Sequence, residues 1–187
     1  MKSVEKIPYH YWEGEFNDHL CDAIIQEGNN LTLEQATVDT NRDVKTNLRN
    51  GLVSWFDTTH WINGLIEQYV RRANELGEWN FRIQGKEKIQ FGTYPREAFY
   101  GWHRDCDIES DVYRKLSVTV QLTDPSTYEE GDFQIKAFDS DKILTEEKLR
   151  KRGTIIVFPS ILKHQVTKVT KGTRQSLVQW YNGPDFT

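Results

Sequence analysis

The chain has 187 residues, of which 28% are charged and 37% are hydrophobic, and its formal net charge is -4. This composition is that of a soluble globular protein rather than of a disordered chain, and the length suits one domain. The acidic balance does not indicate a dedicated nucleic-acid binder, although a local basic groove would escape a net charge. We therefore predict a single domain over residues 1–187.

The first residues lack the apolar stretch of a secretory signal, and no apolar run approaches the roughly 20 residues that cross a bilayer. The two cysteines, Cys21 and Cys106, form no C-x-x-C motif, so reduced thiols are the simpler interpretation. These features predict a cytoplasmic protein without a membrane partner.

Two helices are predicted within about residues 1–85. The first covers 16–28, where Gly28 suits the C-terminal end, and its apolar positions are Phe16, Leu20, Ile24 and Ile25. The second runs from Thr58 or Thr59 to Leu76, with Gly77 just beyond. Its predicted apolar face consists of Trp61, Leu65, Tyr69 and Ala73 or Leu76.

The remainder, about 86–187, is typical of strands. Residues 116–122 alternate strictly, which places Leu116, Val118, Val120 and Leu122 on one face. Further strands are predicted over 88–94, 132–138, 153–159, 166–169 and 174–181, with a Lys171-Gly172 turn before the last. Many short strands behind helices predict a mainly β fold, a jelly-roll core braced by helices on one side.

An H-x-D motif and a distant histidine suggest a metal site. His103 and Asp105 are two residues apart on an extended segment, so their side chains point the same way. With His164 they would form the two-histidine, one-carboxylate facial triad of non-haem Fe(II) oxygenases. Each motif alone is weak, because H-x-D recurs by chance and a lone histidine is more often structural.

A second group of residues could bind a dicarboxylic keto acid. On the last strand Arg174, Ser176, Val178 and Trp180 share one face. Arg174 can hold a distal carboxylate in a bidentate fork, and the Ser176 hydroxyl can add a hydrogen bond. Considered by itself, an arginine at position 174 would more often form a surface salt bridge.

The order of motifs resembles the prolyl 4-hydroxylase-like branch of the 2-oxoglutarate/Fe(II) dioxygenases. The chain carries H-x-D, then G-D at Gly131, then G-T-x-x-x-F-P-S over 153–160, then H-x-V-x-x-V-x-x-G-x-R-x-S-x-x-x-W over 164–180. The last run is similar in particular to PKHD-type hydroxylases. The resemblance covers about half of the chain, from Gln90 to Pro184.

This resemblance implies a double-stranded β-helix and an Fe(II)- and 2-oxoglutarate-dependent hydroxylase that consumes O2 and releases succinate and CO2, with ascorbate as a candidate reductant. It implies that Tyr94 or Tyr100 contacts 2-oxoglutarate and that Trp180 lines the pocket. The chain departs from the family pattern at one loop glycine, where Glu97 stands.

The substrate stays open at this point. By family analogy a prolyl residue in a peptide or protein comes first, and a free amino acid or small metabolite second. Arg49 and Trp55, in the segment 41–55, are candidate substrate contacts, although a solvated loop and a core tryptophan are the simpler interpretations. A nucleic-acid demethylase would share the triad, a halogenase would lack Asp105, and a non-enzymatic binding protein would need none of these groups together.

Overall fold

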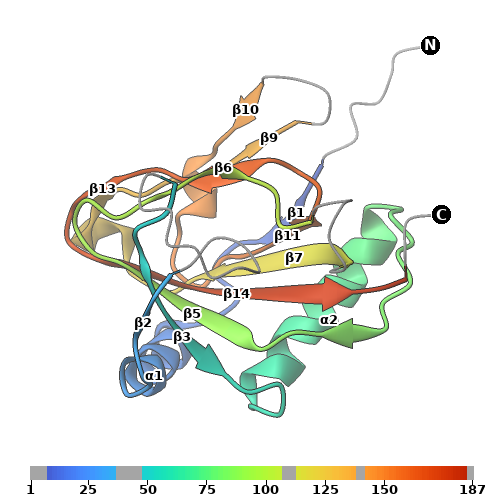
Figure 1. Cartoon of the computed structure of the whole chain (residues 1–187), viewed down its shortest axis with the longest axis horizontal. Coiled ribbons are helices and arrows are strands. Elements are labelled where there is room, and N and C mark those ends of the chain that lie inside the picture. The colour runs from blue at the N-terminus through green and yellow to red at the C-terminus, as the bar shows by residue number, and fades with distance from the viewer. Residues whose placement is uncertain (1–7, 37–47, 107–112, 138–141, 185–187) are drawn as a thin grey trace.

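Two antiparallel sheets face each other in the computed structural model, which describes residues 8–36, 48–106, 113–137 and 142–184. Figure 1 shows the larger sheet across the middle of the molecule, the smaller one above it and both helices below. The prediction of a jelly-roll core with helices on one side is therefore confirmed.

The large sheet forms one side of the barrel. Its strands, in spatial order, are β1 (His10–Trp12), β11 (Ile155–Pro159), β7 (Arg114–Gln121), β14 (Arg174–Asn182), β5 (Ile89–Tyr94), β3 (Leu52–Phe56) and β2 (Glu34–Gln35), and β4 (Gly85–Lys86) pairs with β14. The first half of the chain thus supplies strands as well as helices.

The small sheet packs opposite the large sheet. Its order is β10 (Ile143–Leu144), β9 (Phe133–Lys136), β12 (His164–Val166) and β6 (Tyr100–His103), and a separate pair joins β13 (Val169–Lys171) to β8 (Glu129–Glu130). Two short 3-10 turns cover 125–127 and 147–149.

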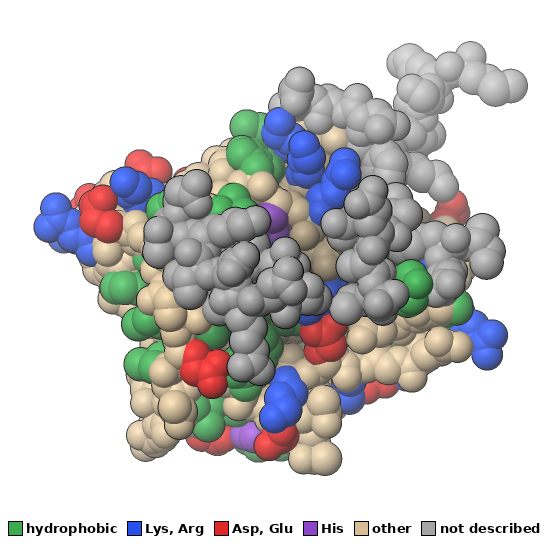
Figure 2. Space-filling model, in the orientation of Figure 1, with side chains coloured by type: hydrophobic (Ala, Val, Ile, Leu, Met, Phe, Trp, Pro, Cys, Tyr) green, Lys and Arg blue, Asp and Glu red, His purple; other side chains and the backbone are tan. Residues whose placement is uncertain are grey.

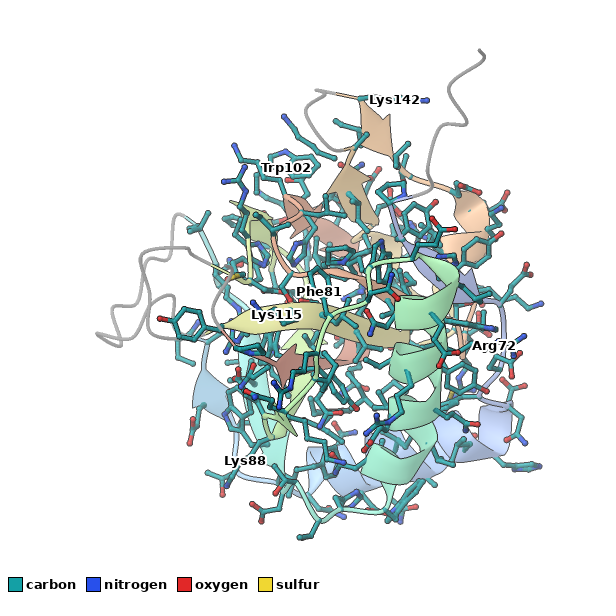
Figure 3. All side chains as sticks on the ribbon, turned by 90° about the vertical axis from the view of Figure 1, so that its right-hand side faces the viewer. Arg72, Phe81, Lys88, Trp102, Lys115 and Lys142 are labelled. Carbon is teal, nitrogen blue, oxygen red and sulfur yellow. The ribbon has the colours of Figure 1, made fainter. Side chains whose placement is uncertain are left out.

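The two helices, α1 (Asp18–Asn29) and α2 (Ile62–Leu76), bury the outer face of the large sheet. Figure 3 shows α2 standing beside the strands, with Trp102 and Lys142 at the opposite end of the molecule from Lys88. The predicted face of 116–122 packs here, since Leu116, Val118 and Val120 lie in the same core as the helices. The other face of β7 consequently points into the barrel.

The first helix begins and ends later than predicted. Asn17 caps it by accepting a 2.9 Å hydrogen bond from the Leu20 N–H, so Phe16 lies outside the helix. Gly28 is not the stop, because the helix continues to Asn29 and Asn30 caps it. Gly28 instead permits close packing, since a Cβ there would lie 2.6 Å from the Phe91 ring.

The second helix begins at Ile62 rather than at Thr58 or Thr59, because a turn closed by the His60 N–H to the Asp57 carbonyl precedes it. The predicted apolar face of this helix is shifted by about one residue from the buried face in the structure. Trp61 and Leu76 are 44% and 55% exposed, and Leu65 and Tyr69 only flank the core. The predicted end of the helix at Gly77 and the predicted burial of Ala73 are confirmed. The buried apolar face consists of Ile62, Ile66, Val70 and Ala73.

The remaining strands match the predictions to within two residues at most ends, with one exception. The predicted strand 166–169 is two strands, because β12 pairs within the small sheet whereas β13 pairs with β8. The Lys171-Gly172 bend therefore carries the chain from one sheet to another and closes no hairpin. Gly172 has a φ of 73°, and a Cβ there would lie 2.2 Å from the Thr127 carbonyl oxygen. The predicted end of strand 132–138 at Phe138, and residues 41–47, lie outside the described residues.

Cys21 and Cys106 are both buried. Among the described residues, neither helix has the length and apolar character to span a bilayer.

Candidate active site

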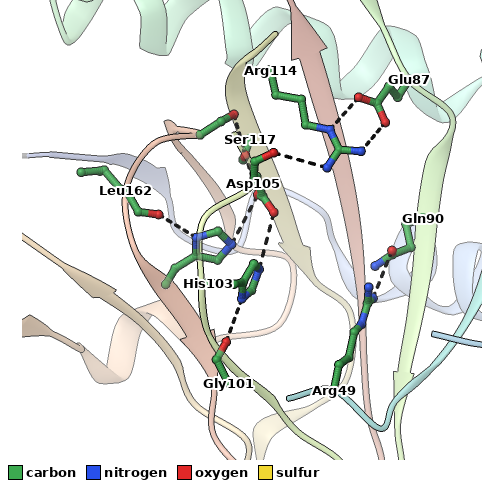
Figure 4. A network of polar contacts seen from close by, with 11 residues as sticks. Arg49, Glu87, Gln90, Gly101, His103, Asp105, Arg114, Ser117 and Leu162 are labelled. Atoms are coloured by element: carbon green, nitrogen blue, oxygen red, sulfur yellow. Dashed lines mark hydrogen bonds and ion pairs between the residues drawn. The ribbon is translucent and has the colours of Figure 1, made fainter. Parts of the chain in front are cut away.

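Three candidate ligands converge between the two sheets. β6 ends at His103, Asp105 follows two residues later, and His164 opens β12 directly opposite His103 in the antiparallel register. The His103 Nε2 lies 3.5 Å from one carboxylate oxygen of Asp105, and the His164 Nε2 lies 3.3 Å from the other. All three ligand atoms lie within 4.8 Å of one another, as Figure 4 shows around Asp105.

Backbone carbonyls orient both imidazoles. The His103 Nδ1 lies 2.8 Å from the Gly101 oxygen, and the His164 Nδ1 lies 2.9 Å from the Leu162 oxygen. A carbonyl can only accept, so each Nδ1 carries a proton, and in the neutral ring each Nε2 offers a lone pair. Both lone pairs then face the same point as the Asp105 carboxylate, which is the donor set that suits Fe(II).

Two serines fix Asp105. The Ser117 hydroxyl on β7 donates to its carboxylate at 2.7 Å and lies 2.9 Å from the Ser160 hydroxyl. The Asp105 N–H donates to the Ser160 carbonyl at 3.0 Å, which anchors the segment after β6. The carboxylate therefore has one oxygen bonded to Ser117 and is held in one orientation.

The three side chains shift one another's pKa values. Burial, with the neighbouring His164, lowers the pKa of His103. Burial also disfavours a charge on His164, but the Asp105 carboxylate outweighs it and raises the pKa of His164. Burial opposes ionisation of Asp105, yet the two histidines hold the pKa of that carboxyl well below its usual range. Without metal, these shifts favour a His164–Asp105 ion pair and disfavour a charge on His103.

Aromatic and arginine side chains surround the triad. The Tyr100 ring stacks on His103, and the Arg49 guanidinium lies 4.4 Å from the Tyr100 ring centre. Arg49 also donates to the Gln90 side-chain oxygen at 3.1 Å and is only 6% exposed. The simpler interpretation of Arg49 as part of a solvated loop is thus wrong, since it is buried beside the site.

Arg114 forms the opposite wall, on β7. Its guanidinium binds both carboxylate oxygens of Glu87 at 2.6 Å and lies 3.9 Å from the Trp180 ring centre. Its remaining nitrogen reaches the Asp105 carbonyl at 3.5 Å. Trp180 in turn lies 6.4 Å, between ring centres, from Trp55 on β3. Trp55 is half-buried at this wall, rather than in the core.

Arg174 lies deep in the barrel, 2% exposed, at the start of β14. It donates to the Ser176 hydroxyl at 3.2 Å and to the Gln121 side-chain oxygen at 2.7 Å, and it lies 5.4 Å from the Tyr94 ring centre. The backbone at Gly131 packs closely against the Arg174 side chain, because a Cβ at Gly131 would lie 3.3 Å from the Arg174 Cδ.

The inner face of β7 connects the two groups. Ser117 bonds Asp105 at one end, Gln121 bonds Arg174 at the other, and Thr119 lies between them. Four residues of strand span roughly 13 Å. An extended five-carbon diacid, with a metal–oxygen bond at one end and a hydrogen bond at the other, fits such a span. The residues present therefore suit both Fe(II) and 2-oxoglutarate.

Ser117 and Gln121 were not predicted from the sequence, and neither were Arg114 and Glu87. The polar positions of β7 alternate with apolar ones, and only the apolar face was predicted from that pattern. The available signal was that Ser117, Thr119 and Gln121 carry no charge, which is unusual for a solvated face.

The model of the 2OG-Fe(II) oxygenase superfamily matches residues 89–182, half of the chain. A PKHD-type hydroxylase of Picosynechococcus is 35% identical over 118 residues, which cover 62% of this chain and 52% of the relative. One of Prochlorococcus marinus is 36% identical over 49% of this chain and 40% of its own length. The chain thus spans about half the length of the curated relatives that it matches.

Solved structures share the fold at low sequence identity. A Pseudomonas putida prolyl-4-hydroxylase has a TM-score of 0.71 at 18% identity, with 95% of this chain and 93% of that chain covered. A Trichoplax adhaerens prolyl hydroxylase, in complex with a peptide fragment of hypoxia inducible factor, has a TM-score of 0.78 at 14% identity, with 94% and 83% covered. With its His-Asp-His triad and its match over residues 89–182, the chain belongs to the 2OG-Fe(II) oxygenase superfamily.

Proposed function

We propose that this chain hydroxylates a C–H bond of a prolyl residue in a peptide or protein, using Fe(II), 2-oxoglutarate and O2. The observation that carries the proposal is the placement of the triad and of Arg174 on one barrel interior, joined by the polar face of β7. In the proposed assignment His103, Asp105 and His164 hold the metal, and Arg174 and Ser176 hold the distal carboxylate.

Each residue has a physical task. Iron with 2-oxoglutarate and O2 supplies the oxidising power for C–H hydroxylation and yields succinate and CO2. The backbone carbonyls behind His103 and His164 keep both Nε2 atoms available, and Ser117 keeps Asp105 in place. Arg174 anchors the co-substrate away from the metal, so that its chelating end has one orientation.

A peptide is supported by the surface next to the site. Two adjoining hollows meet at Leu31 and Trp55, one extending to Glu87 and Lys88 and the other to His60. Glu87 binds Arg114 and Trp55 lies beside Trp180, so this surface continues from the wall of the active site. An extended chain on one side of a prolyl residue would fit such a surface, whereas a small metabolite would not need it.

Electrostatics favour a peptide over a nucleic acid. The chain carries a formal net charge of -4, whereas nucleic-acid binding relies on basic side chains to neutralise phosphates. On the face that Figure 2 shows, several described basic side chains gather in one short row near the top, and the acidic ones lie elsewhere. The similar proteins support the same proposal, because the relatives described above are PKHD-type hydroxylases and the two solved structures are prolyl hydroxylases.

The test is 2-oxoglutarate turnover by iron-loaded protein in the presence of proline-containing peptides, free amino acids or alkylated oligonucleotides. We expect peptides to stimulate succinate formation and to gain the mass of one oxygen atom. Stimulation by free amino acids or by oligonucleotides alone would reassign the substrate. His164→Ala, with its fold checked by circular dichroism, should abolish turnover, and an active variant would contradict the triad.

A further inference from the structure

Gln121 lies beside Arg174 on the inner face of β7 and is 2% exposed. Its side-chain carbonyl oxygen accepts a 2.7 Å hydrogen bond from the Arg174 guanidinium. Guanidinium can only donate, so the atom facing Arg174 must be the oxygen, and the orientation of the amide is fixed. The Nε2 of Gln121 consequently points elsewhere.

That nitrogen has no hydrogen-bond partner among the described residues, although it is fully buried. A buried amide donor without an acceptor is costly, and nearly all such donors in native proteins are paired. The missing acceptor next to a buried guanidinium is most simply an anion. A carboxylate offers enough lone pairs to accept from Arg174 and from Gln121 together.

We infer that Gln121 is a specificity residue for the co-substrate: its oxygen orients Arg174, and its Nε2 donates directly to the distal carboxylate of a dicarboxylic 2-oxo acid. This inference rests on the proposed function, because it assumes that 2-oxoglutarate occupies the barrel. The Gln121 donor on β7 would add to Arg174 and Ser176 on β14, so the carboxylate would be bound by residues of two neighbouring strands.

Gln121→Glu separates this role from mere support of Arg174. The variant keeps an oxygen for the guanidinium and strengthens that contact with a charge. It also replaces the N–H donor by an oxygen that repels the carboxylate. A supporting residue would therefore tolerate the change, whereas a carboxylate ligand would not. Gln121→Met preserves the volume and removes the donor without adding charge.

The experiment is calorimetric titration of the iron-loaded protein, without O2, with 2-oxoglutarate and with 2-oxopentanoate. The second acid keeps the chelating end and the five-carbon chain but lacks the distal carboxylate. We expect Gln121→Glu to weaken 2-oxoglutarate binding roughly 10- to 100-fold and Gln121→Met roughly 10-fold, with 2-oxopentanoate unchanged. Gln175→Glu is the control, because it adds a carboxylate next to Arg174 in sequence but on the other face of β14.

The outcomes are separable. If the parent binds 2-oxoglutarate and either Gln121 variant binds it equally well, the inference is wrong and the proposed function stands. If both variants lose affinity for both acids alike, Gln121 acts on the metal end or on folding, and the inference is again wrong. If the parent does not bind 2-oxoglutarate at all, the proposed function fails and the inference fails with it.

Discussion

The rings of Tyr100 and His103 are stacked with their centres 3.4 Å apart and their planes 10° from parallel. Tyr100 thus fixes the plane of a metal ligand whose Nδ1 is already held by the Gly101 carbonyl. The resemblance to the family implied contact of Tyr94 or Tyr100 with 2-oxoglutarate. The structure places Tyr94 beside Arg174 and Tyr100 beside the metal ligand, at opposite ends of the barrel interior.

Removing the Tyr100 ring should weaken metal binding. Tyr100→Ala deletes a stacking contact of about 0.5–1.5 kcal/mol, so the Fe(II) dissociation constant should rise roughly 2- to 10-fold. Tyr100→Phe keeps the ring and should bind metal as the parent does. Titration with Co(II), followed by its absorption, measures both. A loss in the Phe variant equal to that in the Ala variant would assign the effect to the hydroxyl instead.

Ser117 offers a test of the support behind Asp105. Ser117→Ala removes the 2.7 Å hydrogen bond to the carboxylate and should lower metal affinity roughly 10- to 100-fold, as loss of outer partners does in other metal sites. Ser54→Ala is a matched control, because Ser54 is equally buried but bonds the Gly28 carbonyl on the helix side of the sheet. Equal metal affinities of the two variants would exclude this role for Ser117.

Much of the fold was predictable because strand alternation depends on burial alone. The apolar face of 116–122 and the strand at 174–181 were predicted correctly, since period-two patterns are local. The error at 166–169 has a tertiary cause. The Thr167 N–H bonds the Asp132 carbonyl and its hydroxyl accepts from the Asp132 N–H, so the chain leaves one sheet there and enters another. No local sequence pattern indicates that the chain passes from one sheet to another at this point.

The site was predictable in its charged groups and not in its neutral ones. His103, Asp105 and Arg174 stand out because such residue types in or next to strands demand an explanation. Ser117 and Gln121 do not, because uncharged polar residues alternating along a strand also occur on solvated faces. Their burial follows only from closing two sheets over each other, which the sequence does not display locally.

Glu97 stands where the family pattern has glycine, and the structure supplies the reason for that pattern. Its φ is 70°, a region that disfavours side chains. Glu97→Gly should therefore stabilise the fold by up to about 1 kcal/mol, less the extra entropy of the unfolded chain. The lost contact with Lys168 is exposed and contributes little.

Urea unfolding measures this change in stability. Glu129→Gly is the control: it too removes an exposed glutamate that pairs with a lysine, but from an ordinary strand position, and should destabilise the protein. If both glycine variants lost stability equally, the loop would carry no backbone strain at Glu97.

Metal affinity should depend on pH through His164. Its pKa is raised without metal, so at and somewhat above the ordinary value of about 6.5 it still carries a proton that metal must displace. Metal affinity should fall as pH drops through this raised pKa, approaching tenfold per pH unit.

The stability of the metal-free fold should depend on pH in the opposite way. The His164–Asp105 pair stabilises the fold fully below the unfolded pKa of His164, and this stability is lost as pH rises through the folded pKa. Between about pH 6.5 and the raised pKa of His164, metal affinity and the stability of the metal-free fold should therefore change in opposite directions with pH. Metal titrations and urea unfolding measure the two, and parallel changes in this range would contradict the ion pair.

Arg174 separates the two ends of the co-substrate. Arg174→Ala should leave metal binding nearly intact, because Arg174 contacts Ser176, Gln121 and Tyr94 at the other end of the barrel interior. Binding of 2-oxoglutarate should weaken by about 2–5 kcal/mol, roughly 30-fold to several thousand-fold, since a buried carboxylate would lose its charge-assisted fork. Arg174→Lys should do less harm because it keeps the charge, and Ser176→Ala should cost about 1 kcal/mol. Titration of the iron-loaded protein without O2, followed by the metal-to-ligand charge-transfer band, measures each variant. Unchanged affinity in Arg174→Ala would place the distal carboxylate elsewhere while leaving the metal site as proposed.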